Sequence, residues 1–365
     1  MTSGARPQIV RYDGENQAPF LKEALAVLDQ GGVVAAPTDT VYGLLARADR
    51  PEAIKEIYRL KGRDYRKPLV LLAVEADALV AEPSEIYQRL SRGLWPGGLT
   101  LVVRASPQVK DWGLDSRGTV GLRCPADDFL RNLIQAAGIP LASTSANRSG
   151  QPECYSAGEV LKNLKAAPDL LIEGGQRRRL KPSTVLDISR HPPVILRKGT
   201  VERSEIEACG LTRVLLDRIR VLFVCTGNTC RSPMAEGWLR HRLPRSWRNR
   251  VEVESAGTRA MPGLPATENA RLAAKAKGFD ISGHRSQPLS QDIIASADIV
   301  VAMEEQHRKA VLELWPGAEA MLMSEAGVPD PIGGDRQDYD RTLQAIEKGM
   351  PRVIKWIEER LYLPT

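Results

Sequence analysis

The sequence contains few cysteines and few histidines, and it has no long hydrophobic run. Its five cysteines are an odd number with no paired spacing, so free thiols in a reducing compartment are expected rather than a disulfide framework. With four histidines and neither a Cys-x-x-Cys nor a His-Glu-x-x-His pattern, a structural zinc site is not expected. No stretch approaches the ~18 apolar residues of a membrane span, and residues 1–7 lack the apolar core of a secretory signal. We therefore expect a cytoplasmic protein without a membrane segment.

Length and charge narrow the possible classes of protein. A chain of 365 residues favours two domains, and a hydrophobic share of 42% with a charged share of 26% is typical of a globular protein. The net charge of +6 is mild. It fits ordinary surface charge together with sites for ATP and phosphate better than direct contact with RNA, which stays open.

Short apolar, β-branched runs alternate with amphipathic stretches along the whole chain, which predicts an α/β fold throughout. The expected strands are a turn and strand at Gly31–Pro37, then Leu69–Val74, Leu99–Arg104, Thr119–Arg123, Ile139–Ser143, Ser183–Ile188, Val194–Arg197, Val221–Val224, Val251–Glu254 and Ile299–Met303. The expected helices are Pro51–Leu60, Ser204–Ala208, Arg231–Leu239 and Asp338–Arg360. Residues 198–218 are predicted to be a connector, and a second α/β series begins at Ile219. With the family resemblances described below, we expect a first domain at residues 8–208, a linker at 209–218 and a second domain at 219–362.

The second domain begins with a buried strand that ends in the loop Cys225-Thr226-Gly227-Asn228-Thr229-Cys230-Arg231-Ser232. A loop between a parallel strand and a helix lies at the edge of the sheet where α/β folds bind ligands. Its backbone N–H groups converge on one point at the positive end of the helix dipole, and glycine and asparagine tolerate the backbone that such a nest needs. The loop therefore predicts a phosphate site.

The residue types in this loop favour nucleophilic catalysis. The helix start and Arg231 should lower the pKa of Cys225 well below that of a free cysteine. Arg231 offers a forked donor for two phosphoryl oxygens, and Ser232 offers a hydroxyl to the thiolate. Asp330, in Val328-Pro329-Asp330-Pro331, is a candidate general acid for the leaving group. Taken alone, Cys-x(5)-Arg also fits a buried cysteine beside an ordinary helix start, but its combination with a strand, a helix and a late Asp-Pro favours catalysis.

The segment Val224–Glu236 resembles the low-molecular-weight protein tyrosine phosphatases, and Ser255-Ala256-Gly257-Thr258, His284 and Asp330-Pro331 match further segments of that family. The resemblance covers about residues 219–362. It implies a Rossmann-like parallel sheet, Cys225 as nucleophile, Arg231 as phosphate binder and Asp330 as general acid, with phosphorylated proteins as substrates and no cofactor. The remaining residues that it places in the phosphate loop are Thr226, Gly227, Asn228, Thr229, Cys230 and Ser232.

Two residues of the loop leave alternatives open. Thr229 stands where most phosphotyrosine members carry a larger aliphatic residue, and the loop resembles the bacterial protein-arginine-phosphatase branch; the alternative is a tyrosine phosphatase in which Thr229 only packs the loop. Cys230 either forms a protective disulfide with Cys225 or simply packs the helix start. Arsenate reductases share the loop but need further cysteines downstream, and none follows Cys230.

The first domain has no Gly-x-x-x-x-Gly-Lys-[Ser/Thr] loop. Instead, polar, basic and glycine-flanked segments stand at strand ends: Pro37–Gly43, Lys61-Gly62-Arg63, Lys67-Pro68-Leu69, Trp95–Thr100 and Ser143–Asn147. Lys61, Arg63 and Lys67 could neutralise a triphosphate, although each alone also fits a solvated position after a helix.

Together these segments resemble the YrdC-like threonylcarbamoyl-AMP synthases over about residues 8–208. The resemblance implies a twisted mixed sheet and the synthesis of threonylcarbamoyl-AMP from ATP (with Mg²⁺), L-threonine and bicarbonate, as the donor for a separate tRNA-modifying transferase. By position, the residues expected to bind ATP are Lys61, Arg63, Lys67, Thr119, Ser145, Asn147 and Arg197. Those expected at the threonine pocket are Thr40, Arg123, Ser143 and Ser183. A different class stays open, in which this domain is a double-stranded RNA-binding module.

Overall fold

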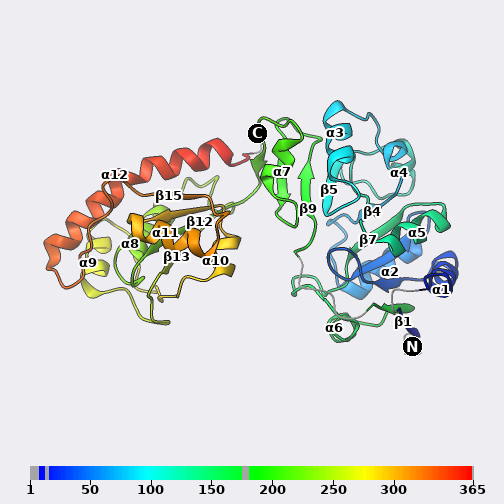
Figure 1. Ribbon diagram of the computed structural model, residues 1–365, viewed down its shortest axis with the longest axis horizontal. Helices are drawn as coiled ribbons and strands as arrows, with labels where there is room; N and C mark the ends of the chain where they lie inside the picture. Colours follow the sequence, from blue (N-terminus) through cyan, green and yellow to red (C-terminus); the bar gives the residue numbers. More distant parts are fainter. Residues whose placement is uncertain (1–7, 13–15, 175–180, 364–365) are drawn as a thin grey trace. The chain divides into compact units, whose positions relative to one another are not determined.

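A computed structural model describes residues 8–12, 16–174 and 181–363. The segment considered for a secretory signal, residues 1–7, lies outside these ranges. The chain divides into two compact units, Met1–Val214 and Leu215–Thr365, and each is described by itself (Figure 1). In the described part of the chain, no helix combines the length and the apolar character that crossing a membrane requires.

The first unit is built on one mixed sheet, as the sequence predicted. Its strands lie in the order β1-β8-β2-β3-β7-β4-β6-β5-β9-β10. The sheet contains both parallel pairs, such as β4 with β6, and antiparallel pairs, such as β3 with β7. The strand bounds are β1 Gln8–Arg11, β2 Val34–Ala36, β3 Gly43–Arg47, β4 Val70–Leu72, β5 Leu99–Arg104, β6 Thr119–Arg123, β7 Leu141–Ser145, β8 Leu170–Glu173, β9 Thr184–Asp187 and β10 Val194–Arg197.

Helices cover this sheet, and their ends follow local sequence signals. Helix α2 begins at Pro51, whose fixed φ suits a first turn, and ends before Gly62, which adopts the left-handed φ of 60° typical of a C-cap. Apolar residues of α1 and α5, among them Leu28, Leu130 and Leu133, pack with strand residues in the main core. The helices are α1 Ala18–Asp29, α2 Pro51–Lys61, α3 Glu85–Leu94, α4 Pro107–Asp111, α5 Asp128–Ala137, α6 Ala157–Asn163 and α7 Arg203–Ala208, with a 3₁₀ turn at Asp77–Leu79.

The second unit contains a fully parallel sheet, which confirms the predicted Rossmann-like class. Its order is β13-β12-β14-β15, with β12 Ile219–Cys225 paired on one side to β13 Val251–Gly257 and on the other to β14 Ile299–Ala302, and with β15 Ala320–Leu322 at the edge. The short β11 is Leu215–Leu216. The helices are α8 Arg231–Arg242, α9 Glu268–Ala276, α10 Gln291–Ser296, α11 Glu305–Leu314 and α12 Arg336–Arg360. Since all four strands run the same way, their carboxyl ends share one edge, where Cys225 ends β12.

Several elements differ from the sequence expectation. The strand expected at Leu69–Val74 is shorter, and the one expected at Ile139–Ser143 lies two residues later, at Leu141–Ser145. Strand β3 was not expected, because Gly43 had been assigned to a binding loop and the strand after it is only five residues long. The last helix begins at Arg336 rather than Asp338, since the Asp335 side chain caps it by accepting from the backbone N–H groups of Gln337 and Asp338.

The packing around Gly199 gives a stability prediction for the first unit. A Cβ at Gly199 would lie 2.2 Å from the carbonyl oxygen of Pro182, and backbone cannot yield as a flexible side chain can. Gly199→Ala should therefore lower the free energy of unfolding of this unit by about 1–3 kcal/mol. The matched control is Gly158→Ala, in α6, where an added Cβ meets nothing within 4 Å and the change should be about 1 kcal/mol or less. Equal urea-unfolding midpoints for the two variants would contradict the prediction.

Candidate active sites

The loop after β12 surrounds the sulfur of Cys225 with donors. Cys225 is 2% exposed, and its Sγ lies 3.0 Å from the hydroxyl of Ser232. The backbone N–H of Asn228 donates to the same sulfur at 3.3 Å. Because Ser232 lies in the first turn of α8, the thiol faces the positive end of that helix. The geometry is that of a nucleophile at the base of an anion cradle.

Asn228 holds the loop in shape. It adopts a left-handed φ of 54°, which asparagine tolerates better than most residues. Its side-chain amide donates to the hydroxyls of Ser232 at 2.9 Å and Ser255 at 2.8 Å. Its Oδ1 accepts from the backbone N–H of Gln287, and its backbone carbonyl lies 2.7 Å from His284 Nε2. These bonds fix the backbone N–H groups of the loop toward one point.

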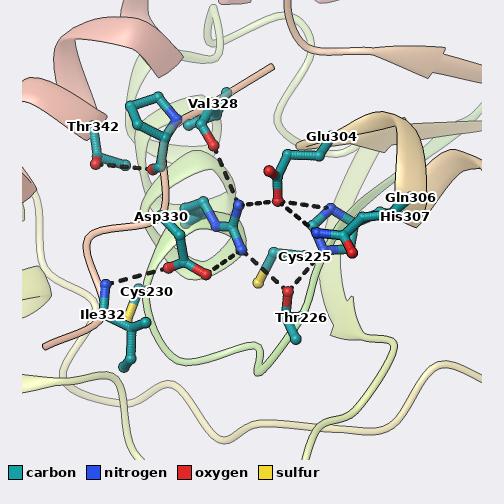
Figure 2. Close-up of polar contacts among 12 residues, drawn as sticks. Cys225, Thr226, Cys230, Glu304, Gln306, His307, Val328, Asp330, Ile332 and Thr342 are labelled. Atoms are coloured by element: carbon teal, nitrogen blue, oxygen red, sulfur yellow. Dashed lines mark hydrogen bonds and ion pairs between the residues drawn. The ribbon is translucent and has the colours of Figure 1, made fainter.

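Arg231 is fully buried and contacts two carboxylates (Figure 2). Its Nη1 donates to Glu304 at 2.5 Å, and its Nη2 donates to Asp330 at 2.6 Å. Further bonds reach the carbonyl of Val328 at 3.2 Å and the hydroxyl of Thr226 at 3.1 Å. The structure therefore brings the predicted general acid, Asp330, to the phosphate loop. An arriving dianion must compete with these two carboxylates for the guanidinium.

The electrostatics of Cys225 correct one expectation. Burial raises the pKa of the Cys225 thiol, although the hydrogen bonds from Ser232 and Asn228 and the charge of Arg231 lower it in part. The sequence predicted a pKa well below that of a free cysteine, and that prediction is wrong for this structure. The reason is physical: burial of the sulfur disfavours the charged thiolate more strongly than these hydrogen bonds and the charge of Arg231 favour it.

The sequence analysis gave no role to Glu304 and His307. Both follow β14, whose carboxyl end lies at the same sheet edge as Cys225. His307 Nε2 lies 2.8 Å from the hydroxyl of Thr226. Burial acts to raise the pKa of Glu304, but hydrogen bonds from Arg231 and Gln306 outweigh it and the pKa is lowered. The available signal was the position of these two residues, immediately after a buried strand.

Cys230 and Cys225 are both free cysteines. Cys230 Sγ lies 3.4 Å from the hydroxyl of Tyr339 and 3.5 Å from that of Thr267. The neighbouring Thr229 accepts a backbone hydrogen bond from Thr267 and is half-buried. In this state Cys230 packs the helix start, one of the two alternatives that the sequence left open.

In the first unit, Arg123 at the end of β6 contacts residues at and around the expected threonine pocket. Its Nη1 donates to Thr40 Oγ1 at 3.0 Å and its Nε to the carbonyl of Gly97 at 2.9 Å. Its Nη2 forms an ion pair with Asp39 at 2.7 Å, without the angles of a hydrogen bond. Ser143 is buried on β7, which pairs with β3. The structure thus brings hydroxyls and a guanidinium together at adjacent strand ends.

Ser183 and Arg197 form the next group. Arg197 Nη2 donates to the hydroxyl and the carbonyl of Ser183, each at 2.9 Å. The Ser183 hydroxyl also lies 2.9 Å from that of Thr100. Arg197, which is expected to bind ATP, is therefore bonded directly to Ser183, which is expected to bind threonine. Such a contact suits a site where the two substrates react.

Lys61 contacts two of the other residues that the sequence analysis expected to bind ATP, Ser145 and Asn147. It is 2% exposed, and its ammonium donates to oxygens of Ser145 and Asn147 at distances of 2.6–3.1 Å. Burial lowers the pKa of Lys61 to about 8, opposed by the charge of Glu153 and lowered further by Arg63 and Arg197. The mutual repulsion shows that these cations share one region, and at neutral pH the ammonium keeps its proton.

The other candidates lie further out. Arg63 donates to the carbonyls of Lys67 and Pro68, so it shapes the loop that follows α2. Thr119 begins β6, four residues before Arg123, and its hydroxyl donates to the carbonyl of Ser116. The structure does not bond Thr119 to the other candidates. It does place Thr119 and Lys67 beside residues that line a cavity of about 440 Å³, whose aromatic side chains are Tyr58, Tyr65 and Trp112.

Family models match both parts of the chain. Residues 26–199 match the Sua5/YciO/YrdC model, described as telomere recombination, and residues 220–362 match the model for low molecular weight phosphotyrosine protein phosphatase. A threonylcarbamoyl-AMP synthase from Vibrio campbellii is 32% identical over 183 residues, which cover 49% of this chain and 98% of that protein. The chain therefore belongs to the Sua5/YciO/YrdC family, and its C-terminal part is a low-molecular-weight phosphatase domain.

Longer relatives match over part of their length. A threonylcarbamoyl-AMP synthase from Pyrococcus abyssi is 38% identical over 193 residues, 51% of this chain. The chain spans about half, 56%, of that relative and of one from Bacillus subtilis. The structure of P. abyssi Sua5 complexed with L-threonine has a TM-score of 0.52 at 24% identity, covering 94% of this chain and 98% of that one, and so shares the fold. An arginine phosphatase from Geobacillus stearothermophilus matches at 34% identity and a TM-score of 0.35, covering 38% and 93%.

The bonds of Asn228 generate a prediction about the second unit. Asn228→Ala removes the donors to Ser232 and Ser255 and places alanine at a left-handed φ, so the free energy of unfolding should fall by about 2–4 kcal/mol. Asn228→Gly removes the same donors without the backbone strain and should cost about 1 kcal/mol less. Binding of inorganic phosphate should weaken in both variants.

The matched control is Asn269→Ala in α9, whose side chain makes a single long bond of 3.4 Å to the carbonyl of Gly334. Urea unfolding and phosphate titration would measure both effects. A loss in Asn228→Ala no larger than in this control would contradict the role given to Asn228.

Proposed function

We propose that the first unit makes threonylcarbamoyl-AMP from ATP, L-threonine and bicarbonate, as the donor for a separate transferase that modifies tRNA. The observation that carries this is the convergence of cations and hydroxyls, in which Arg197 bonds directly to Ser183. The names of the relatives, and the threonine in the P. abyssi structure, support it. An RNA-binding module is less favoured, because Lys61 and Arg123 are buried and bonded to oxygens rather than displayed on a surface.

In the proposed reaction, the threonine amine and bicarbonate give a carbamate and water, and a carbamate oxygen then attacks the α-phosphorus of ATP and displaces pyrophosphate. Arg63 and Arg197 would hold the phosphates, with Lys61 and Asn147 fixing Ser145 beside them. Thr40, Arg123, Ser143 and Ser183 would hold threonine. Lys67 and Thr119 lie beside residues that line the cavity of Tyr58, Tyr65 and Trp112, which would take the adenine base. Mg²⁺ would enter with ATP, held mainly by phosphate oxygens and water.

For the second unit we infer a protein phosphatase that works through a phospho-cysteine. The Cys225 thiolate, formed by loss of the thiol proton to water, attacks phosphorus, the S–P bond forms, and the bond to the leaving atom breaks as protonated Asp330 gives that atom its proton. Asp330 then takes a proton from water, the water oxygen attacks phosphorus, and the S–P bond breaks to release phosphate and the thiolate. Arg231 stabilises the charge on the phosphoryl oxygens in both steps. Its bond to Asp330 supports this, because it places acid and clamp within 2.6 Å of each other.

The substrate that we propose is phosphoarginine in proteins. Support comes from Thr229, which stands in the loop wall beside Asn228 and is half-buried. Its hydroxyl can pair with a guanidinium N–H group that an aliphatic side chain would leave unpaired. Phosphotyrosine is the alternative.

We take residues 8–208 and 219–362 as the two domains, with 209–218 as linker, since α7 ends at Ala208 and β12 begins at Ile219. We place both activities in the cytoplasm, where ATP is available and the Cys225 thiol stays reduced.

A reciprocal pair of variants tests the two activities in one chain. Arg63→Ala should lower ATP-, threonine- and bicarbonate-dependent pyrophosphate release by about 10²–10³-fold and leave phosphatase turnover unchanged. Cys225→Ser should abolish phosphatase turnover and leave pyrophosphate release unchanged, because the nucleophile is lost and the first unit is untouched. Each variant is the control for the other. Near wild-type pyrophosphate release in Arg63→Ala, or near wild-type phosphatase turnover in Cys225→Ser, would remove that residue from its role.

Thr229→Ile tests the substrate. Wild type should prefer phosphoarginine over phosphotyrosine peptides, and the variant should shift the ratio of kcat/KM toward phosphotyrosine by about ten- to a hundredfold, the worth of one polar or steric contact. Thr229→Ser keeps the hydroxyl and should keep the preference. If wild type already hydrolyses phosphotyrosine peptides better, the arginine proposal fails and tyrosine phosphatase takes its place.

A further inference from the structure

His307 is a buried side chain that the phosphatase mechanism above does not use. It lies in the first turn of α11, is 2% exposed, and its Nε2 is 2.8 Å from Thr226 Oγ1. Its Nδ1 is buried without a hydrogen-bond partner among the described residues. The carboxylate oxygen Oε2 of Glu304 lies 3.9 Å from Nδ1. An enclosed imidazole with one bonded nitrogen calls for a physical explanation.

The charges around the ring favour one of its two neutral tautomers. Arg231 is only a donor, so the contact from its Nη2 to Thr226 at 3.1 Å uses one lone pair of the hydroxyl and leaves the hydroxyl proton available to another acceptor. Because the Glu304 carboxylate lies 3.9 Å from Nδ1, we assign the ring proton to Nδ1. In that tautomer Nε2 is unprotonated and accepts the hydroxyl proton of Thr226. A chain of bonds therefore runs from His307 through Thr226 to Arg231.

The charges around the ring are consistent with a neutral imidazole. Burial and the positive charge of Arg231 lower the pKa of His307, while Glu304 and Asp330 act to raise it less strongly. These three charged residues come from α8, from the start of α11 and from the loop after Val328. A neutral ring can accept the Thr226 proton, whereas a protonated ring could not.

We propose that His307 is a positioning residue for the phosphatase reaction: by accepting the hydroxyl proton of Thr226, it turns the oxygen of that hydroxyl toward Arg231. This rests on the proposed phosphatase function. The bond between His307 and Thr226 matters most in the step when Asp330 leaves Arg231 to protonate the leaving group. Nη2 then keeps one fixed acceptor, and the guanidinium stays aligned with the phosphoryl oxygens. His307 touches neither substrate nor the reacting atoms.

Two substitutions separate hydrogen bonding from packing. His307→Leu fills much of the space but accepts no proton, and kcat/KM for a phosphorylated peptide should fall about tenfold, the worth of one buried hydrogen bond. His307→Gln places an amide oxygen at a reach similar to that of Nε2, so kcat/KM should stay within about threefold of wild type. The inhibition constant of inorganic phosphate should follow the same order. The matched control is His241→Gln, a histidine outside the described contacts of the loop, which should match wild type.

A double-mutant cycle tests whether His307 acts through Thr226. Thr226→Val should lose about as much activity as His307→Leu, and the double variant should lose no more than either, because both remove one chain of bonds. Losses that multiply would overturn the proposal, as would equal activities for wild type, His307→Leu and His307→Gln. If His307→Leu fails to fold by urea unfolding, the cycle is run with His307→Phe. Wild type that hydrolyses neither phosphoarginine nor phosphotyrosine peptides would instead refute the proposed function itself.

Discussion

The buried guanidinium of Arg231 is the constraint on which much of the second unit depends. A charge without oxygen partners in a protein interior is costly, and four residues from three segments meet the requirement: Glu304, Val328, Asp330 and Thr226. Strand β14 and the loop before α12 must end at this edge of the sheet to supply them. The fold therefore brings Asp330 to the loop that holds Cys225 as a consequence of satisfying one buried cation.

The first unit also contains a buried cation that needs oxygen partners, the ammonium of Lys61. The ammonium of Lys61 joins the end of α2 to the polar segment after β7, through oxygens of Ser145 and Asn147. A point charge with three donors suits a tight cluster of single oxygens, whereas the planar fork of Arg231 suits two carboxylates. In both units a buried cation fixes the residues around the ligand and is itself held by them.

The sequence predicted the parts of each site that lie close together in the chain. The loop from Cys225 to Ser232 is local, and its strand and helix follow from hydrophobic pattern and residue type. Glu304 and His307 are more than seventy residues downstream, and only the pairing of β12 with β14 places them at the loop. The order of strands in a sheet cannot be inferred from the local hydrophobic periodicity of the sequence. The expected low pKa of Cys225 failed for a related reason, because burial has the largest effect on that pKa and the burial of a side chain depends on packing that the local sequence does not reveal.

The two carboxylates on Arg231 also act as an internal competitor. In the structure, both Nη atoms of the guanidinium already donate to oxygen acceptors, so a ligand gains bonds to them only by displacing groups of the protein. A singly charged anion offers less than Glu304 and Asp330 already give. A phosphoryl dianion can add the backbone N–H groups of the loop to its bonds with Arg231, and Asp330, once released, is free to serve as acid. The two carboxylates therefore favour the binding of doubly charged anions over singly charged ones at this site.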